Sequence, residues 1–320
     1  MSEERNKISV VIPVYNRADW IGKTLDHIFA QQEAIDEVIL CDDGSSDELY
    51  SAVEPYRSKV KIIRIENSGP GAARKVAIEN SSSEWIALCD SDDFWFTNHI
   101  KNFRIACNKF PAMNFYFSNF KLSDDAENSK FSNSPTDWFN FIARNHNSTE
   151  YVECGENLYK GLLEFQCCFP STCIFRRELY DLVGGIDSSI SRWPSEDAHL
   201  TRRLAAYGSA VICKAETVLI NKHDSNFSKN HLFNFEGRIK ILTKLVSDRA
   251  LPPVNVEQTK EEIEKSRLNL FRLYFWNKNY RKAATFFRRE LRWQGSGKDY
   301  LRFFASLVLS VTCRARTSIN

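Results

Sequence analysis

The sequence lacks the features that would direct it across a membrane or anchor it in one. Its first residues, MSEERNKISVVIPVYN, do not show the charged, then apolar, then small-residue order of a signal peptide. No run reaches the ~18 uncharged apolar residues that a membrane-spanning helix requires. We therefore expect a cytoplasmic protein whose only contact with the cell membrane would be peripheral, at the inner face.

Paired metal-binding cysteines and a strong charge of one sign are missing too. The nine cysteines lie mostly in apolar runs and form no CxxC pair of zinc-finger spacing, so we expect buried free thiols in a reducing compartment. A net charge of +2 over 320 residues argues against nucleic acid as a partner. Only the chain from Glu257 onward is basic, with 14 Lys and Arg against 6 Asp and Glu, which suits an anionic surface.

The sequence does contain short apolar runs that alternate with helical segments. Ile8–Val14 is a continuous apolar run that fits a strand buried on both faces, and Asp19–Gln31 has the apolar spacing of a helix. This alternation continues to Lys109 and predicts parallel strands joined by crossover helices. Later strands are expected over Asn114–Leu122 and Ser171–Phe175, and a short hairpin over Ala210–Cys213 with Thr217–Ile220.

A change of pattern near residue 226 divides the chain. Helical spacing dominates beyond it, so we predict an α/β domain over residues 1–228 and a helical region over residues 229–320. The polar stretch Ser123–Asn147 is interpreted as an excursion or mobile loop. The aromatic residues of the C-terminal helices, interleaved with Arg and Lys, fit either a small bundle or a membrane-contacting face with Leu301–Val311 as the inserting segment.

Polar clusters follow four of the predicted strands, at the edge where an open parallel sheet binds ligands. Asp90 and Asp92 stand two residues apart after an apolar strand, where a divalent cation would relieve the repulsion between their carboxylates. Oxygen ligands favour Mg²⁺ or Mn²⁺, which often share their shell with substrate phosphates. The alternative is that Asp92 or Asp93 caps the following helix. The four clusters are Pro13–Arg17, Asp42–Asp47, Asn67–Gly71 leading to Arg74, and Asp90–Asp93.

The other clusters also have a structural and a functional interpretation. Asp42 and Asp43 could bind a base or ribose, or form an Asx turn with the following glycine. Gly69–Arg74 fits a helix N-terminus that faces an anion, with Arg74 in reach of phosphate or base. Asp197 follows Glu196 at a helix start, where acidic side chains commonly interact favourably with the helix dipole. Alternatively, Asp197 could take a proton from an acceptor hydroxyl. His223 is either a surface histidine or a metal ligand.

In this order, these motifs resemble those of family 2 glycosyltransferases with the GT-A fold, over about residues 8 to 228. The resemblance implies a mixed, mainly parallel sheet flanked by helices, followed by a C-terminal helical appendage. It implies inverting transfer of a sugar from a nucleotide-diphosphate sugar to a glycan or lipid-linked hydroxyl, as in cell-surface polysaccharide synthesis. UDP is the commonest carrier in the family, so we expect a UDP-sugar. The segments that carry the resemblance are Ile8–Asn16, Cys41–Asp47, Gly69–Arg74, Asp90–Asp93, Phe175–Arg177, Gly184–Asp187 and Glu196–Leu204.

The resemblance also implies a role for individual residues. Asp197 would be the catalytic base, with Glu196 and Trp193 on the acceptor side. Asp92 and His223 would hold the divalent metal, Mn²⁺ or Mg²⁺. The nucleotide-sugar would be bound by Pro13, Tyr15, Asn16, Asp42, Asp43, Arg74, Asp90 and Ser91.

Two other functions stay open. A nucleotidyltransferase would also use an α/β sheet, a metal and phosphates, but it would normally show a glycine-rich loop directly after the first strand, where this chain has Tyr15–Ala18. A catalytically degenerate sugar-nucleotide-binding protein would have lost an acid at Asp90, Asp92 or Asp197, and none is missing.

Overall fold

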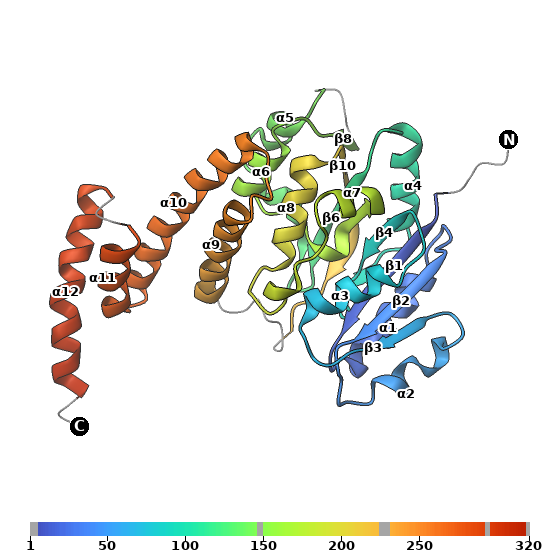
Figure 1. Cartoon of the computed structure of the whole chain (residues 1–320), viewed down its shortest axis with the longest axis horizontal. Helices are drawn as coiled ribbons and strands as arrows, with labels where there is room; N and C mark the ends of the chain where they lie inside the picture. The colour runs from blue at the N-terminus through green and yellow to red at the C-terminus, as the bar shows by residue number, and fades with distance from the viewer. Residues whose placement is uncertain (1–5, 146–149, 224–230, 292–294, 318–320) are drawn as a thin grey trace. The chain divides into compact units, whose positions relative to one another are not determined.

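The computed structural model of the chain describes residues 6–145, 150–223, 231–291 and 295–317, which form two compact units (Figure 1). Unit 1 comprises Met1–Asn226 with Ala250–Pro252, and unit 2 comprises Phe227–Arg249 with Pro253–Asn320. Each unit has its own buried apolar cluster, as a separately packed body requires.

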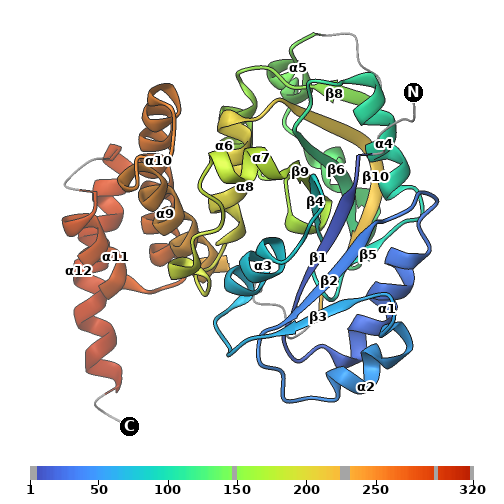
Figure 2. The same ribbon diagram turned by 45° about the vertical axis from the view of Figure 1, so that its right-hand side comes forward.

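Unit 1 is built on a mixed sheet in the order β3-β2-β1-β4-β9-β6-β10-β5, with β7 paired to β6 and β8 to β10 (Figure 2). Strands β3, β2, β1 and β4 run parallel, as the alternation of the sequence predicts. Strand β9 then pairs antiparallel with both β4 and β6. The strands are β1 (Ile8–Val14), β2 (Glu37–Asp42), β3 (Lys61–Arg64), β4 (Trp85–Leu88), β5 (Phe94–Trp95), β6 (Phe115–Leu122), β7 (Asp125–Ser129), β8 (Tyr151–Glu153), β9 (Cys173–Arg176) and β10 (Ala210–Ile220).

Helices cover both faces of this sheet (Figure 2). Because successive side chains of a strand point to opposite faces, Val10 and Ile12 of β1 pack on the side of α1, α2 and α4, whereas Val11 packs on the side of α3, α6, α7 and α8. All of β1 is therefore buried. The helices of unit 1 are α1 (Ala18–Phe29), α2 (Leu49–Val53), α3 (Pro70–Glu79), α4 (His99–Lys109), α5 (Trp138–Ile142), α6 (Leu158–Glu164), α7 (Arg177–Leu182) and α8 (Asp197–Tyr207).

The pairing of β1 with β2 extends further along the strand than its pairing with β4. β1 stays paired with β2 as far as Val14 and Asp42, but with β4 only as far as Val11 and Leu88. Pro13 has no N–H to donate, so it cannot extend the pairing with β4. Since β1 lies between β2 and β4, this is the point where the strand order reverses, and open α/β sheets bind ligands beyond such a point.

One expectation about local structure is wrong, and another is correct only in part. Residues 210–220 form the single strand β10, parallel to β6, rather than a hairpin. The residues interpreted as a turn, around Ala215, instead form register shifts within this strand, because β6, β8 and β5 all pair with it. The polar stretch Ser123–Asn147 contains β7, a 3₁₀ turn over Lys130–Asn133 and α5; its buried Trp138 and Ile142 are too few to give a periodic pattern.

Unit 2 consists of helices in its described residues: α9 (His231–Ser247), α10 (Pro253–Trp276), α11 (Tyr280–Arg289) and α12 (Gly297–Thr317). Phe287 of α11 stacks on Phe303 of α12 at 4.8 Å between ring centroids and meets Phe271 of α10 at 4.9 Å. Many of the C-terminal aromatic residues thus form a bundle core. None of the helices in the described ranges is long and apolar enough to cross a lipid bilayer.

Candidate active site

The loops that follow β1 and β2 are held together by hydrogen bonds. The backbone N–H of Asn16 donates to the Ser45 hydroxyl at 3.0 Å, and the Asn16 side chain accepts from the Ser46 N–H at 2.8 Å. Asn16 has a φ of 50°, in the left-handed region that asparagine tolerates better than most residues. The sharp turn leaves the Tyr15 side chain 47% exposed at the end of the buried strand, while Pro13 is buried.

The two aspartates that follow β2 are engaged with their own chain. Asp43 accepts from the backbone N–H of Ser68 at 2.7 Å and of Gly69 at 2.8 Å, which fixes the loop before α3. Asp42 is fully buried, accepts from the Ser45 N–H at 2.7 Å and forms an ion pair with Arg64. Asp42 thus bonds the N–H three residues on, not two as in an Asx turn, and its burial favours a supporting role for this residue.

One buried arginine links acids that lie far apart in the sequence. A guanidinium nitrogen of Arg74 lies 2.6 Å from Asp90 Oδ1, after β4, and the other terminal nitrogen bonds Glu196, at the start of α8. The Arg74 side chain is only 7% exposed. Because an unpaired charge is costly to bury, these contacts hold the end of β4 and the start of α8 together around Arg74.

The acids at the start of α8 hold their protons more tightly than usual. Burial raises the pKa of Glu196 to about 7, although Arg74 opposes the rise. Burial also raises the pKa of Asp197, and the charge of Asp90 adds to the effect while Arg74 opposes it. A carboxylate with a raised pKa accepts a proton more readily near neutral pH, which suits a general base.

Asp92 lies against a histidine and a second arginine. Its Oδ2 is 2.9 Å from His223 Nε2 and accepts from Arg17 Nε at 3.2 Å. The His223 ring stacks on Trp20 of α1 at 4.9 Å between centroids. A carboxylate and an imidazole are donors that suit Mn²⁺, and ions of this kind are commonly held by one or two carboxylates and substrate phosphates. Across the described residues, no three His, Cys, Asp or Glu side chains form a complete metal site.

Asp93 caps no helix; it is a buried junction between three segments. Its Oδ2 accepts from the Ser171 hydroxyl at 2.5 Å, and its Oδ1 accepts from the Asn221 N–H at 3.0 Å. Ser171 in turn accepts from the Asp90 N–H at 2.9 Å, and the Asn221 amide donates to the Asp92 carbonyl at 2.6 Å. The acidic turn after β4 is thus fixed to the segment that carries His223.

The start of α3 is covered by the segment before α8. Ser191 accepts from the backbone N–H of Ala72 at 2.7 Å, so the expectation that this helix end faces an anion is wrong for that N–H. Gly69 precedes the helix with a φ of +95°, and a Cβ there would lie 2.7 Å from Ser191 Oγ. Only glycine fits this close approach without strain.

The model of the family described as Glycosyl transferase family 2 matches residues 9–183, more than half of the chain. The chain belongs to glycosyl transferase family 2. The matched range of this family 2 chain contains the loops after β1 and β2, Arg74 and the Asp90–Asp93 turn, whereas Glu196, Asp197 and His223 lie beyond it.

Curated relatives match part of this family 2 chain. It is 33% identical over 127 residues to an uncharacterized glycosyltransferase of Rickettsia conorii, which is 39% of the chain and 20% of that protein. It is 34% identical over 113 residues to the succinoglycan biosynthesis protein ExoW of Rhizobium meliloti, which is 33% of the chain and 35% of that protein. It is 31% identical over 121 residues to the UDP-Glc:alpha-D-GlcNAc-diphosphoundecaprenol beta-1,3-glucosyltransferase WfaP of Escherichia coli, 37% of the chain and 47% of that protein. The chain thus spans a fifth to a half of the length of these relatives.

Solved structures confirm the GT-A fold predicted from the sequence. TarS of S. aureus, residues 1–349 in complex with UDP, superposes with a TM-score of 0.61 at 17% identity, over 88% of this chain and 80% of that one. The mannosyltransferase PcManGT from Pyrobaculum calidifontis, in complex with GDP-Man and Mn²⁺, gives a TM-score of 0.59 at 18% identity, over 98% and 83% of the two chains. At this identity the likeness extends to the fold alone.

The structure brings together most of the residues singled out in the sequence, although their roles stay predictions. Asp90, Glu196 and Asp197 surround Arg74, and Asp92 meets His223. The Ser91 side chain is buried, and its carbonyl accepts from Thr24. Trp193 is half-buried in the loop before α8. Sequence reasoning missed Ser171, Ser191 and Asn221, whose partners are distant in sequence. It placed Arg17 in a polar cluster but did not predict its contact with Asp92.

Proposed function

We propose that this chain is a metal-dependent inverting glycosyltransferase that moves a sugar from a nucleotide diphosphate to an acceptor hydroxyl. The observation that carries the proposal is the junction at Arg74, where Asp90 from the ligand-binding edge of the sheet meets Glu196 beside Asp197. An inverting displacement needs a donor-side acid and a base close together, and the junction supports the proposal on that ground.

Asp197 is the proposed catalytic base. It would accept the proton of the attacking hydroxyl, and the hydroxyl would attack the anomeric carbon from the face opposite the leaving diphosphate, so that the configuration inverts. The raised pKa of Asp197, caused first by burial, favours this proton transfer. Glu196 and Arg74 would orient the base, and Trp193 would contact the acceptor sugar.

Asp92 and His223 are the residues that would hold Mn²⁺ or Mg²⁺. When bound, the metal would stabilise the negative charge that builds on the leaving diphosphate. Arg17, whose Nε already contacts Asp92, supplies a fixed positive charge in the same place. Pro13, Tyr15, Asn16 and Asp43, with Asp42 behind them, would form the pocket for the base and ribose.

The donor and acceptor are proposed from the relatives. The S. aureus TarS structures contain UDP or UDP-GlcNAc, and PcManGT contains GDP-Man. The name of WfaP gives UDP-Glc as donor and a diphosphoundecaprenol-linked sugar as acceptor, and ExoW is named for succinoglycan biosynthesis. A UDP-sugar donor and a glycan or lipid-linked acceptor are therefore proposed here. Residues 1–228 would catalyse the transfer at the inner face of the cell membrane.

A screen of nucleotide sugars tests this function without knowledge of the acceptor. UDP-Glc, UDP-GlcNAc and GDP-Man are incubated with the full chain and Mn²⁺, and free nucleotide diphosphate is measured. We expect slow hydrolysis of one of the UDP-sugars that stops when a chelator is added. Binding without hydrolysis of any donor would favour a catalytically degenerate binding protein, and hydrolysis unchanged in chelator would contradict the metal site.

The role of Asp197 is tested by its isosteric variant Asp197→Asn. Because proton transfer by a placed base contributes ~10²–10⁴-fold, we expect turnover to fall by at least ~100-fold while calorimetry shows nearly unchanged UDP binding. Asp181→Asn, on the exposed side of α7, is the matched control and should retain activity. Unchanged turnover in Asp197→Asn would refute the assignment.

A further inference from the structure

We propose that unit 2 docks on an anionic lipid bilayer through the solvent-facing sides of α11 and α12. The docking surface consists of three arginines of α11, Arg281, Arg288 and Arg289, and three apolar residues of α12, Leu301, Phe304 and Val308. This inference concerns a surface of unit 2 and does not depend on the chemistry proposed for unit 1.

The apolar part of the docking surface is a stripe along α12. Leu301 is 70% exposed, Phe304 55% and Val308 64%. Their spacing of three and four residues places them on one side of the helix. The opposite side is occupied by Phe303 and Ser306, both buried. Large apolar side chains in a row at the surface of a helix mark a contact with another apolar phase.

The charged part lies on α11, which has an exposed cationic side. Arg281, Arg288 and Arg289 are exposed, and across the described residues none of them forms an ion pair. Other arginines of unit 2 are neutralised: Arg267 pairs with Glu264 and Arg272 with Asp299. The positive charges of these three arginines are therefore not balanced within the described residues and can attract an anionic partner.

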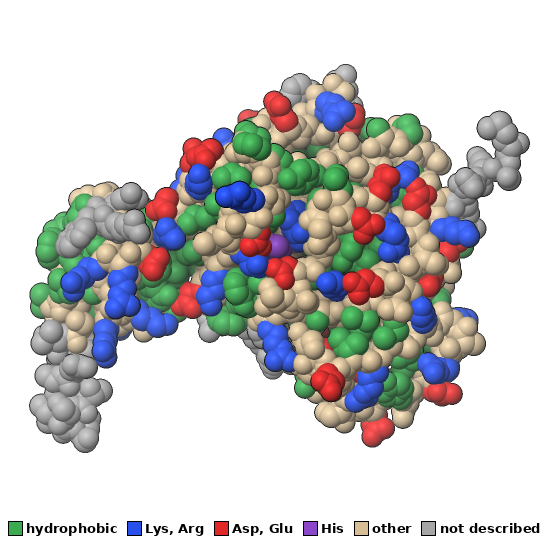
Figure 3. Space-filling model, in the orientation of Figure 1, with side chains coloured by type: hydrophobic (Ala, Val, Ile, Leu, Met, Phe, Trp, Pro, Cys, Tyr) green, Lys and Arg blue, Asp and Glu red, His purple; other side chains and the backbone are tan. Residues whose placement is uncertain are grey.

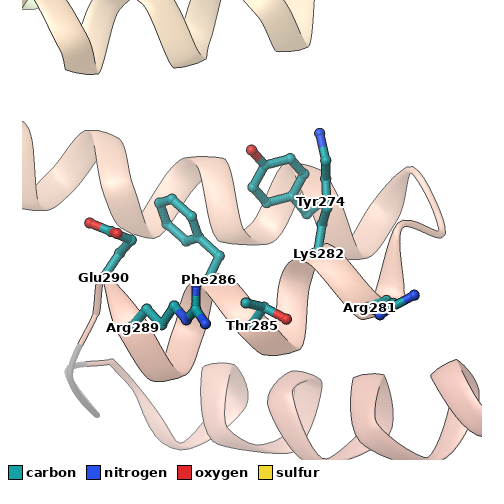
Figure 4. Close-up of a pocket in the computed structure, with 7 residues that line it drawn as sticks. All are labelled: Tyr274, Arg281, Lys282, Thr285, Phe286, Arg289 and Glu290. Atoms are coloured by element: carbon teal, nitrogen blue, oxygen red, sulfur yellow. The ribbon is translucent and has the colours of Figure 1, made fainter.

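A shallow groove lies along this side of α11, with a volume of about 390 Å³. It is lined by the ring of Tyr274 of α10, by Glu290 directly after α11, and by five residues of α11, Arg281, Lys282, Thr285, Phe286 and Arg289 (Figure 4). Cationic side chains beside aromatic rings suit the interfacial zone of a bilayer, where phosphates lie next to the first methylene groups.

The two parts belong to neighbouring helices of one bundle. Phe287 of α11 packs against Tyr300 and Phe303 of α12, so the two helices lie side by side. Lys and Arg side chains gather on the visible face of unit 2, next to hydrophobic side chains (Figure 3). An anionic bilayer can satisfy both at once, since phosphates meet the arginines while the apolar stripe enters the acyl boundary. A nucleic acid or an acidic polymer would leave the stripe in water.

Vesicle flotation with the full chain tests the docking surface. Vesicles of phosphatidylcholine alone are compared with vesicles that contain phosphatidylglycerol, at low and high salt. We expect the chain to float only with the anionic vesicles, and to be released at high salt because salt screens exposed charges. Absence of flotation with anionic vesicles at low salt would overturn the proposal.

Two triple variants separate the contributions. One replaces the stripe, as Leu301→Ser, Phe304→Ser and Val308→Ser, and the other replaces the cations, as Arg281→Gln, Arg288→Gln and Arg289→Gln. We expect each to lower the bound fraction at least ~10-fold, because neither signal alone anchors a protein stably. The matched controls are Leu182→Ser on α7, 70% exposed, and the triple variant of three exposed cations, Arg57→Gln, Lys101→Gln and Lys265→Gln.

The remaining outcomes also decide. If the stripe variant binds vesicles like the wild type, and an acidic polymer competes with the vesicles for the chain, the partner is a soluble polyanion and the proposal is wrong. If sedimentation shows a dimer that the stripe variant dissociates, the stripe is an interface between copies and the proposal is wrong. Both variants should keep the thermal midpoint of the wild type and its rate of nucleotide-sugar hydrolysis without vesicles. Flotation therefore tests the docking surface, and hydrolysis tests the enzymatic proposal.

Discussion

Glu196 stabilises the folded protein less as the pH rises, and its replacement tests the electrostatics of the whole site. Burial raises the pKa of Glu196 from 4.5 to about 7. Between these values the folded chain holds a proton that the unfolded chain has released, so the free energy of unfolding falls as the pH rises through this window. Since one pKa unit corresponds to 1.36 kcal/mol, the loss at pH 8 is about 3 kcal/mol.

Glu196→Gln removes the charge but keeps the shape and a polar partner for Arg74. The variant is therefore expected to be more stable than the wild type by up to about 3 kcal/mol at pH 8, and by almost nothing at pH 4, where the wild-type carboxyl is protonated. For a folded unit of this size, the gain corresponds to a rise in the thermal midpoint of roughly 6–12 °C at pH 8.

The assay is thermal unfolding of the full chain, followed by near-ultraviolet circular dichroism between pH 4 and pH 8, without donor or metal. Glu164→Gln, at the exposed end of α6, is the matched control, and its midpoint should follow the wild type at every pH. A midpoint of Glu196→Gln that is equal to or below the wild type at pH 8, or a gain that does not vary with pH, would refute the reasoning. The stabilised variant is expected to turn over more slowly, because a functional site commonly carries such strain.

Three further substitutions test the remaining contacts. Asp92→Ala should abolish Mn²⁺-dependent hydrolysis while the fold persists, and full activity in the presence of a chelator would exclude the metal role. Ser171→Ala removes a shared hydrogen-bond partner of Asp90 and Asp93. We expect it to weaken Mn²⁺ binding in the presence of UDP by ~10-fold, measured by electron paramagnetic resonance. The control Thr172→Ala, in the same turn, should leave Mn²⁺ binding unchanged. Gly69→Ala forces a side chain into the left-handed backbone beside Ser191 and should cost about 1–3 kcal/mol of stability in urea unfolding, whereas an unchanged midpoint would contradict the close approach.

The sequence by itself predicts the parallel half of the sheet and the edge at which the candidate site lies. Ile8–Val14 is apolar throughout because both faces of β1 are covered, and a pattern of this kind is local in the chain. The four polar clusters follow strands that run in the same direction, so their convergence needs no knowledge of tertiary contacts. The family follows from the same motifs, in the same order.

Tertiary structure alone decides which side chains meet. Arg74 and Glu196 are 122 residues apart, and Ser171 reaches Asp93 from a turn with no motif. The single strand β10 arises because three other strands pair along it, which no local pattern of residues 210–220 encodes. The raised pKa of Glu196 likewise comes first from its burial.

The C-terminal helices show the same division. Their sequence shows many aromatic and basic residues. It does not show that Phe287 and Phe303 are buried in the bundle while Phe304, the residue after Phe303, faces solvent. Periodicity determines which residues share a side of a helix, whereas the neighbouring helices determine which side is covered. Local pattern thus specifies the elements and the edge of the sheet that carries the candidate site, and packing specifies the partners and charges of its side chains.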